Sequence, residues 1–366
     1  MNCTGAVLRT AGSALTLESL AVGNLAASDV VVRIGATSLC HTDLEAVEGH
    51  LGTPLPMLPG HEAAGIVDWI GPAVTTVAVG DHVIISWNPH CGTCFYCARQ
   101  QPILCKDYRA NAAKSLHFDG APRLFIDGDA VHPLMYAGTF AELAVVTESC
   151  AVVISRAMPL DLACLIGCGV MTGVGAAPNI AKVEPGSSAT VIGCGAVGLS
   201  AIQGARLAGA ARIIAVDRDP AKHALARQFG ATHTLAANDA LVAAHADITD
   251  GRGADYVFEA AGNPAAFRAS MEMVRPGGQV VWLGKVPVND DVAFRWGSLM
   301  GEKKIVRSSY GGATPQRDFP MLVNAYLDGR LLLDEYVTRR IKLADVNDGL
   351  ARLKRGLEIR SVIEFA

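Results

Sequence analysis

The sequence predicts an α/β protein, with a doubly wound parallel sheet in the middle of the chain and a small barrel of short antiparallel strands, which begins the chain and which the C-terminal end rejoins. Up to about residue 39, short stretches alternate apolar and polar positions, which is typical of half-buried antiparallel strands. After about residue 170, short apolar strands alternate with helical patterns, which is typical of parallel βαβ units. Residues 359–365 again form a strand pattern, so we expect the C-terminal end to rejoin the first domain.

Composition limits the class of protein. The 366 residues are enough for two domains with full cores, and 51% hydrophobic and 18% charged residues are typical of a globular chain. A net charge of −4 without a basic run argues against a nucleic-acid partner. The N-terminus has no signal-peptide pattern and no uninterrupted apolar run is long enough to span a bilayer, so we expect no membrane association. Ten cysteines, six of them at metal-ligand spacings, favour a reducing cytoplasm over disulfides.

Three separated residues predict a catalytic metal site. His61 precedes an apolar run that is typical of a buried strand, Cys40 lies upstream and Cys168 lies far downstream between two glycines. Two thiolates and one imidazole leave one position of a tetrahedral zinc ion open, which is the arrangement of a catalytic site. A lone histidine would more often be a core or surface residue, and the two cysteines are what change that interpretation.

Residues 40–49 follow a short-helix pattern that Gly49 stops. Within this segment, Asp43 is a candidate to accept a hydrogen bond from His61 and so to fix the tautomer of its ring. The alternative is an aspartate on the helix surface.

Four cysteines within fifteen residues, Cys91, Cys94, Cys97 and Cys105, are the most specific local signal in the chain. Four thiolates surround one zinc ion tetrahedrally and leave no position open, so the role of such a site is structural. A pair of disulfides is the alternative. The following segment, 106–137, shows no period and is expected to be a long surface loop that shapes a substrate entrance. In it, Arg109 and His117 either contact substrate or are solvated loop residues.

A nucleotide-binding pattern begins the second half of the chain. A strand at 188–192 leads into Gly-Cys-Gly-Ala-Val-Gly, an Ala/Leu-rich helix and a second strand at 212–216 that ends at Asp217. This order predicts a dinucleotide site with the pyrophosphate at the helix N-terminus, whereas a purely structural βαβ unit is the alternative. Asp217 favours NAD because its charge repels a 2′-phosphate, although Arg218 weakens that preference. The expected cofactor residues are Gly193, Gly195, Ala196, Val197, Gly198, Asp217 and Arg218.

Further βα units follow. We expect a strand at 255–258, a helix at 264–274 and a strand at 279–283, with helices on both faces of the sheet. Two more helices are expected near residues 320–328 and 344–356.

Taken together, these motifs resemble the zinc-dependent alcohol dehydrogenases of the medium-chain dehydrogenase/reductase family. The resemblance covers nearly the whole chain through Cys-His-Thr-Asp at 40–43, Gly-His-Glu at 60–62, the cysteines at 91–105, Gly-Cys-Gly at 167–169, the glycines at 193–198 and Ile-Arg-Ser at 359–361. It implies a catalytic domain with a GroES-like β-barrel (residues 1–169 and 310–366, with the structural zinc lobe near 91–105) and a Rossmann NAD-binding domain (170–309).

The resemblance also implies a role for single residues. Cys40, His61 and Cys168 would bind the catalytic zinc, and Glu62 would lie beside it as a transient ligand. Thr42 would hydrogen-bond the substrate oxygen and pass its proton outward. The other implied contacts are His41 and Arg360 with the pyrophosphate, Thr172 with the nicotinamide, Lys222 and Asp217 with the adenosine ribose, and Leu51 and Trp87 with substrate in its channel.

The implied reaction is a reversible hydride transfer between an alcohol and NAD, with two zinc ions per chain, one catalytic and one structural. One position departs from the family pattern: Glu45 stands where many relatives have the histidine that completes the proton relay. The relay ends in Glu45, in water or in another group, and the sequence leaves these alternatives open.

The leading interpretation is a zinc- and NAD-dependent dehydrogenase of primary alcohols. Trp87 and the absence of charge in the channel favour bulky or aromatic alcohols, unless Trp87 only packs the channel wall. A thiol-adduct (S-hydroxymethyl) formaldehyde dehydrogenase is the alternative, which Arg109 permits and Leu51 argues against, since such relatives tend to have an acidic residue near that position. A non-catalytic member of the fold would lack the intact ligand set. The resemblance further implies a homodimer or homotetramer, in which the strand near Val280 and the region after Gly284 pair across a two-fold axis.

Overall fold

The computed structural model describes the backbone of residues 1–112, 114–287 and 289–365, and all of their side chains except those of residues 109, 111 and 112. The chain divides into two units. The first consists of Met1–Cys168 and Thr314–Ala366, and the second of Gly169–Ala313. The boundaries expected from the sequence, after residues 169 and 309, lie close to these divisions.

Among its described residues, the first unit contains two sheets. One has the strand order β1-β2-β7-β8-β4, and the other has the order β10-β6-β5-β3-β18-β17 with β9 paired to β3. Except in the pairs β4–β8 and β17–β18, the strands of these sheets are antiparallel. The strands are β1 (Asn2–Val7), β2 (Thr16–Val22), β3 (Asp29–Ser38), β4 (Met57–Leu58), β5 (Glu62–Ile70), β6 (His82–Ile85), β7 (Leu124–Ile126), β8 (Asp129–Pro133), β9 (Leu143–Thr147), β10 (Ala151–Val153), β17 (Val337–Ile341) and β18 (Arg360–Glu364).

Strand β3 is the centre of the larger sheet. Its alternating residues Val30, Val32 and Ile34 are buried in a core with apolar side chains of β5 and β6. The C-terminal strand β18 pairs with β3, so the expectation that the end of the chain rejoins this unit is confirmed. Because β3 ends where β5 begins, the residues just beyond β3 and at the start of β5 lie at the same edge of the sheet.

The helices of the first unit are α1 (His41–Val47), α2 (Lys106–Ala112), α3 (Leu160–Leu165), α9 (Pro315–Leu327) and α10 (Val346–Lys354). Helix α1 lies within the expected helix at 40–49. Helices α9 and α10 lie at the two helical segments expected near the C-terminal end.

The expectation of a long loop at 106–137 was wrong. This segment contains helix α2, the hairpin of β7 and β8, and a 3₁₀ turn at Leu134–Tyr136. Asp127 and Gly128 have positive φ angles of 52° and 91°, as a two-residue hairpin turn requires. An Asp-Gly pair between short apolar runs is a hairpin signal, but here the runs are too short to show a period. These two short strands are stabilised by the pairing of β7 with the distant strand β2.

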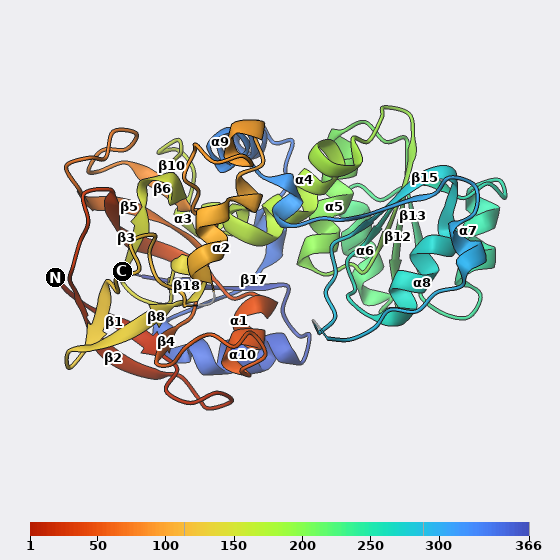
Figure 1. Cartoon of the computed structure of the whole chain (residues 1–366). Coiled ribbons are helices and arrows are strands. Elements are labelled where there is room, and N and C mark those ends of the chain that lie inside the picture. Colours follow the sequence, from red (N-terminus) through yellow and green to blue (C-terminus); the bar gives the residue numbers. More distant parts are fainter. Residues whose placement is uncertain (113, 288, 366) are drawn as a thin grey trace. The chain divides into compact units, whose positions relative to one another are not determined.

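The second unit contains a six-stranded sheet in the order β13-β12-β11-β14-β15-β16, and every pair in it is parallel. This is the doubly wound order, so the parallel sheet expected from the sequence is confirmed. Figure 1 shows its helices beside the strands. The strands are β11 (Ser188–Ile192), β12 (Arg212–Asp217), β13 (His233–Ala236), β14 (Ala254–Glu259), β15 (Val274–Trp282) and β16 (Lys304–Arg307), and the helices are α4 (Met171–Gly175), α5 (Ala196–Leu207), α6 (Ala221–Gln228), α7 (Leu241–Ile248) and α8 (Pro264–Met273).

One helical stretch, Leu160–Ala181, is long and apolar enough to cross a bilayer by length and composition alone, with a mean hydropathy of 1.7. It is not an uninterrupted apolar run, because Asp161, Thr172 and Asn179 lie within it. However, 78% of its most apolar 18-residue segment is buried inside the structure, as in a core helix of a soluble protein. Two π-helical turns, Ile166–Val170 and Ala176–Ala181, interrupt the stretch, and the first contains Cys168.

Candidate active site

The first site is built around the imidazole of His61, which is fully buried. Its Nδ1 donates to Oδ1 of Asp43 at 2.9 Å, so the predicted hydrogen bond is confirmed. Asp43 also accepts from the backbone nitrogens of Gly60, at 3.0 Å, and Cys40, at 2.9 Å. A carboxylate with three donors has little freedom to move, so it fixes both the ring orientation and the tautomer of His61.

Gly60 is required by close packing next to this histidine. Its φ is 96°, and a Cβ atom there would lie 2.5 Å from the backbone nitrogen of Phe140. A residue with a side chain would therefore displace the backbone that carries His61.

The ligand atoms of four residues converge at this point. One atom from each of Cys40, His61, Glu62 and Cys168 lies within 4.8 Å of the other three. Nε2 of His61 is buried and has no hydrogen-bond partner among the residues that the structure describes. A buried polar atom without a partner is costly, and a metal ion would satisfy this nitrogen together with the two sulfurs. The side chains of this group thus fit a zinc ion.

The ionisable side chains of this group shift one another's pKa values in opposite directions. A hydrogen bond with Cys168, opposed by burial and assisted by His61, lowers the pKa of Cys40 well below that of a free thiol. The same hydrogen bond and burial raise the pKa of Cys168. Burial works against a charged His61, but the Asp43 carboxylate and Cys40 outweigh it and raise the pKa of His61. The thiolate is the form that binds metal, so the lowered pKa of Cys40 favours its ligand form.

Glu62 has two partners that the sequence did not predict. Its Oε1 accepts from Nη2 of Arg360 at 3.2 Å, and its Oε2 accepts from Oγ of Ser38. Burial raises the pKa of Glu62 to about 7, although Arg360 opposes the shift. These partners come from strands distant in the chain, so no local pattern indicates them.

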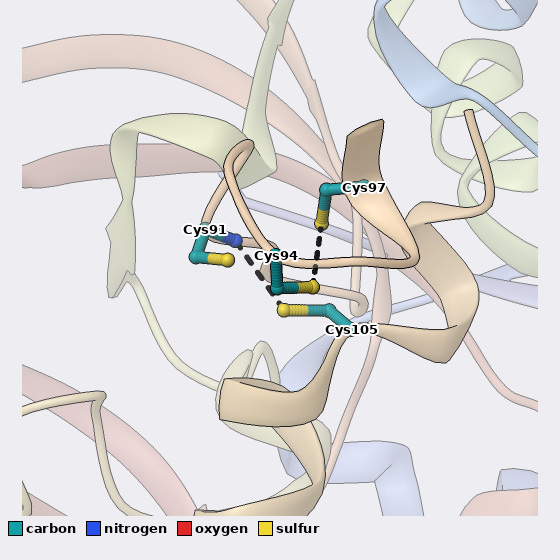
Figure 2. Close-up of side chains that lie close together, drawn as sticks. All are labelled: Cys91, Cys94, Cys97 and Cys105. Carbon is teal, nitrogen blue, oxygen red and sulfur yellow. Dashed lines mark hydrogen bonds between the residues drawn. The ribbon is translucent and has the colours of Figure 1, made fainter. Parts of the chain in front are cut away.

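The second site is the cysteine lobe. Figure 2 shows the sulfur atoms of Cys91, Cys94, Cys97 and Cys105 directed toward one another. All ten cysteines of the chain are free, and the Cys94 and Cys97 sulfurs are 3.6 Å apart, far beyond a disulfide bond. Hydrogen bonds from the backbone nitrogens of Cys97 and Lys106 lower the pKa of Cys94 to about 6. The lobe thus has the residues of a closed four-thiolate site.

The nucleotide-binding pattern lies in the second unit. A Cβ on Gly198 would lie 1.7 Å from the carbonyl oxygen of Gly193, so the turn into α5 requires glycine. Asp217 ends β12 and is 7% exposed. Its Oδ2 accepts from the Cys194 nitrogen at 2.7 Å and lies 3.8 Å from Nζ of Lys222. This arrangement holds the carboxylate beside the turn at which a dinucleotide binds in such sheets.

The other predicted substrate and cofactor residues differ in their exposure to solvent. Among those of the first unit, His41 is exposed and Thr42 half-buried on α1, Trp87 is nearly buried and Leu51 is 42% exposed. In the second unit, Gly195 and Ala196 begin α5 with Val197 next along it, Thr172 is half-buried on α4, and Arg218 is exposed after β12.

His117 is not the solvated loop residue that we considered. It is 2% exposed, and its Nδ1 lies 3.7 Å from Oδ1 of the buried Asp29. The side chain of Arg109 lies outside the described residues.

A parallel sheet with a glycine-rich turn, together with a Cys–His–Cys group in which Cys40 and His61 are buried and Cys168 is partly buried, defines the class of metal-dependent dehydrogenases with a nucleotide-binding unit. Comparison with known protein families gives the same class. Residues 26–156 match the alcohol dehydrogenase GroES-like domain, and residues 196–327 match the zinc-binding dehydrogenase domain. The chain therefore belongs to the zinc-binding alcohol dehydrogenases of the medium-chain dehydrogenase/reductase family.

Individual relatives cover the whole chain. It is 37% identical to alcohol dehydrogenase class-3 of Myxine glutinosa over 100% of this chain and 98% of that protein. It is 36% identical to alcohol dehydrogenase 1 of Trifolium repens, over 100% of this chain and 97% of that protein. The crystal structure of benzyl alcohol dehydrogenase from Acinetobacter calcoaceticus matches over 100% of both chains with a TM-score of 0.94 and 31% identity. The protein is thus an oxidoreductase of the zinc alcohol dehydrogenase type, which acts on small-molecule alcohols and aldehydes.

Proposed function

We propose that this enzyme reversibly oxidises bulky or aromatic primary alcohols to aldehydes, with NAD as hydride acceptor and a catalytic zinc held by Cys40, His61 and Cys168. The observation that carries the proposal is the convergence of these side chains around the unpartnered Nε2 of His61. Three ligands leave one position for a substrate oxygen. We also propose a structural zinc in the lobe, a catalytic first unit, an NAD-binding second unit, and a cytoplasmic homodimer or homotetramer.

Each side chain of the first unit has a defined part in this mechanism. When bound, zinc would supply Lewis-acid polarisation of the substrate oxygen. Asp43 keeps the His61 ring in its orientation through the 2.9 Å hydrogen bond. Thr42 would accept the proton of the substrate hydroxyl and pass it outward, with Glu45 or water as its acceptor. NAD would accept the hydride, and the protein would hold its nicotinamide in position.

Two observations support an aromatic or bulky alcohol. Trp87 is 9% exposed, so it offers a rigid apolar surface rather than a mobile one. Benzyl alcohol dehydrogenase, by its name an enzyme of an aromatic alcohol, shares the fold over the full chain. The second candidate, an S-hydroxymethyl thiol-adduct dehydrogenase, is favoured by the similarity to an alcohol dehydrogenase of class 3. Leu51 offers no charge for such an adduct.

The decisive experiment follows NADH or NADPH absorbance over a panel of primary alcohols and S-hydroxymethyl thiol adducts. We expect the highest kcat/KM for benzyl-type alcohols with NAD. A clear preference for the thiol adduct would replace the leading substrate assignment by the second candidate. No turnover with any alcohol, in a chain loaded with zinc, would contradict the proposed function itself.

Asp217→Gly is expected to shift the ratio of kcat/KM values for NAD and NADP toward NADP by roughly tenfold. This corresponds to about 1.4 kcal/mol of lost repulsion between the carboxylate and a 2′-phosphate. Asp219→Asn is the matched control, because it removes a nearby negative charge while Asp217 remains, and its ratio should match that of the wild type. An unchanged ratio in Asp217→Gly would place cofactor selection elsewhere.

A further inference from the structure

Ser38 lies on the strand between the two strands that carry Glu62 and Arg360. It is the last residue of β3 and is the direct partner of Glu62 across the antiparallel β3–β5 ladder. On its other side, Ser38 pairs with Val362 of β18, the strand that begins with Arg360. Ser38 and Glu62 are both fully buried. The sheet thus places a hydroxyl beside a carboxylate in the interior of the unit.

Both oxygens of Glu62 already accept hydrogen bonds. Ser38 donates to Oε2, and Arg360 donates to Oε1 at 3.2 Å. A serine hydroxyl has a single proton, so donation to Glu62 fixes how this hydroxyl is oriented. Hydrogen bonds to a charged acceptor are among the stronger ones in proteins. The carboxylate is therefore held at two points.

The same carboxylate also lies within reach of the metal-ligating group. One of its oxygens is within 4.8 Å of the ligand atoms of Cys40, His61 and Cys168. A metal ion and the two donors would attract the same negative charge, so they compete for Glu62. A fourth protein ligand would close the position that substrate needs.

We propose that Ser38 is a positioning residue that holds the Glu62 carboxylate beside the catalytic metal and keeps it from becoming a permanent ligand. Arg360 supplies the second point of attachment, and the open position is thereby kept for substrate. The inference rests on the proposed function in taking Cys40, His61 and Cys168 as the catalytic zinc ligands. Neither the sequence motifs nor the similarity to known relatives assigns a role to Ser38.

The test compares the wild type with Ser38→Ala after the catalytic metal has been replaced by cobalt, whose visible spectrum reports its ligands. Without the hydroxyl, Glu62 is expected to ligate the metal. The cobalt bands should therefore change, and release of cobalt to a chelator should slow by about tenfold, the scale on which neighbouring partners alter metal affinity. The KM for the alcohol should rise more than kcat falls, because Glu62 then competes with substrate.

Two further variants separate this role from a structural one. Thr37→Val removes a neighbouring buried hydroxyl that donates to the backbone oxygen of Glu62 at 3.0 Å, and it should leave the spectrum and the release rate unchanged. Ser38→Ala combined with Glu62→Gln should restore release toward the wild-type rate, since an amide is a poor ligand for the metal. Restoration by this second change shows that the effect passes through the carboxylate.

An unchanged or faster release from Ser38→Ala would overturn the positioning role, as would a double variant that behaves like the single one. These results would leave the proposed function intact. A wild-type chain that takes up no cobalt at this group would instead overturn the proposed function and this inference with it.

Discussion

Replacing Cys168 by Ser, or His61 by Ala, is expected to lower kcat/KM by at least roughly a thousandfold, since loss of a Lewis acid worth several kcal/mol corresponds to that factor. Both side chains belong to the converging group, and the free Nε2 of His61 is the nitrogen available to a metal. The change should cost one zinc per chain, measured by elemental analysis. The lobe zinc and the far-ultraviolet circular dichroism should be unaffected.

Cys164→Ala provides a matched control for the first of these variants. Cys164 is a fully buried thiol on α3, four residues before Cys168, and its sulfur donates to the carbonyl oxygen of Asp161 rather than joining the metal-ligating group. This variant should keep both zinc ions and most of its turnover. Near-normal turnover in Cys168→Ser or His61→Ala would remove that residue from the ligand set.

Replacing Cys105 by Ser is expected to release the lobe zinc and to lower the melting temperature by roughly 10 °C or more, because a structural metal contributes its binding energy to folding. Cys105 is fully buried, and its sulfur accepts a hydrogen bond from the Cys91 nitrogen at 3.4 Å. Its replacement therefore removes both a metal ligand and an acceptor for the lobe backbone. Metal content should fall from two zinc ions per chain to one, and the catalytic ion should be the one retained.

Cys150→Ala is the matched control for Cys105→Ser. Cys150 is also buried, but it lies outside both metal-ligating groups. It should retain two zinc ions per chain. If Cys105→Ser also kept two zinc ions and an unchanged melting temperature, the lobe would not be a structural zinc site.

Features formed by neighbours in the chain could be predicted from the sequence. The spacing of Cys91, Cys94, Cys97 and Cys105 indicates their cluster, because these residues lie on one short segment. The turn into α5 and the acid at the end of β12 follow from local requirements for glycine and from strand periodicity. The hairpin of β7 and β8 was missed because its strands are too short to show a period and depend on the distant β2.

The sequence by itself determined which residue types this protein brings to its chemistry: two cysteines and a histidine for a metal, an aspartate beside the histidine, and glycines for a dinucleotide. Only the tertiary structure decided how Glu62 is held. Ser38 and Arg360 are 24 and 298 residues away from it in the chain, and they meet it because β5, β3 and β18 are neighbours in one sheet. Pairing between distant strands leaves no local pattern in a sequence, since backbone hydrogen bonds rather than residue spacing set which side chains face each other.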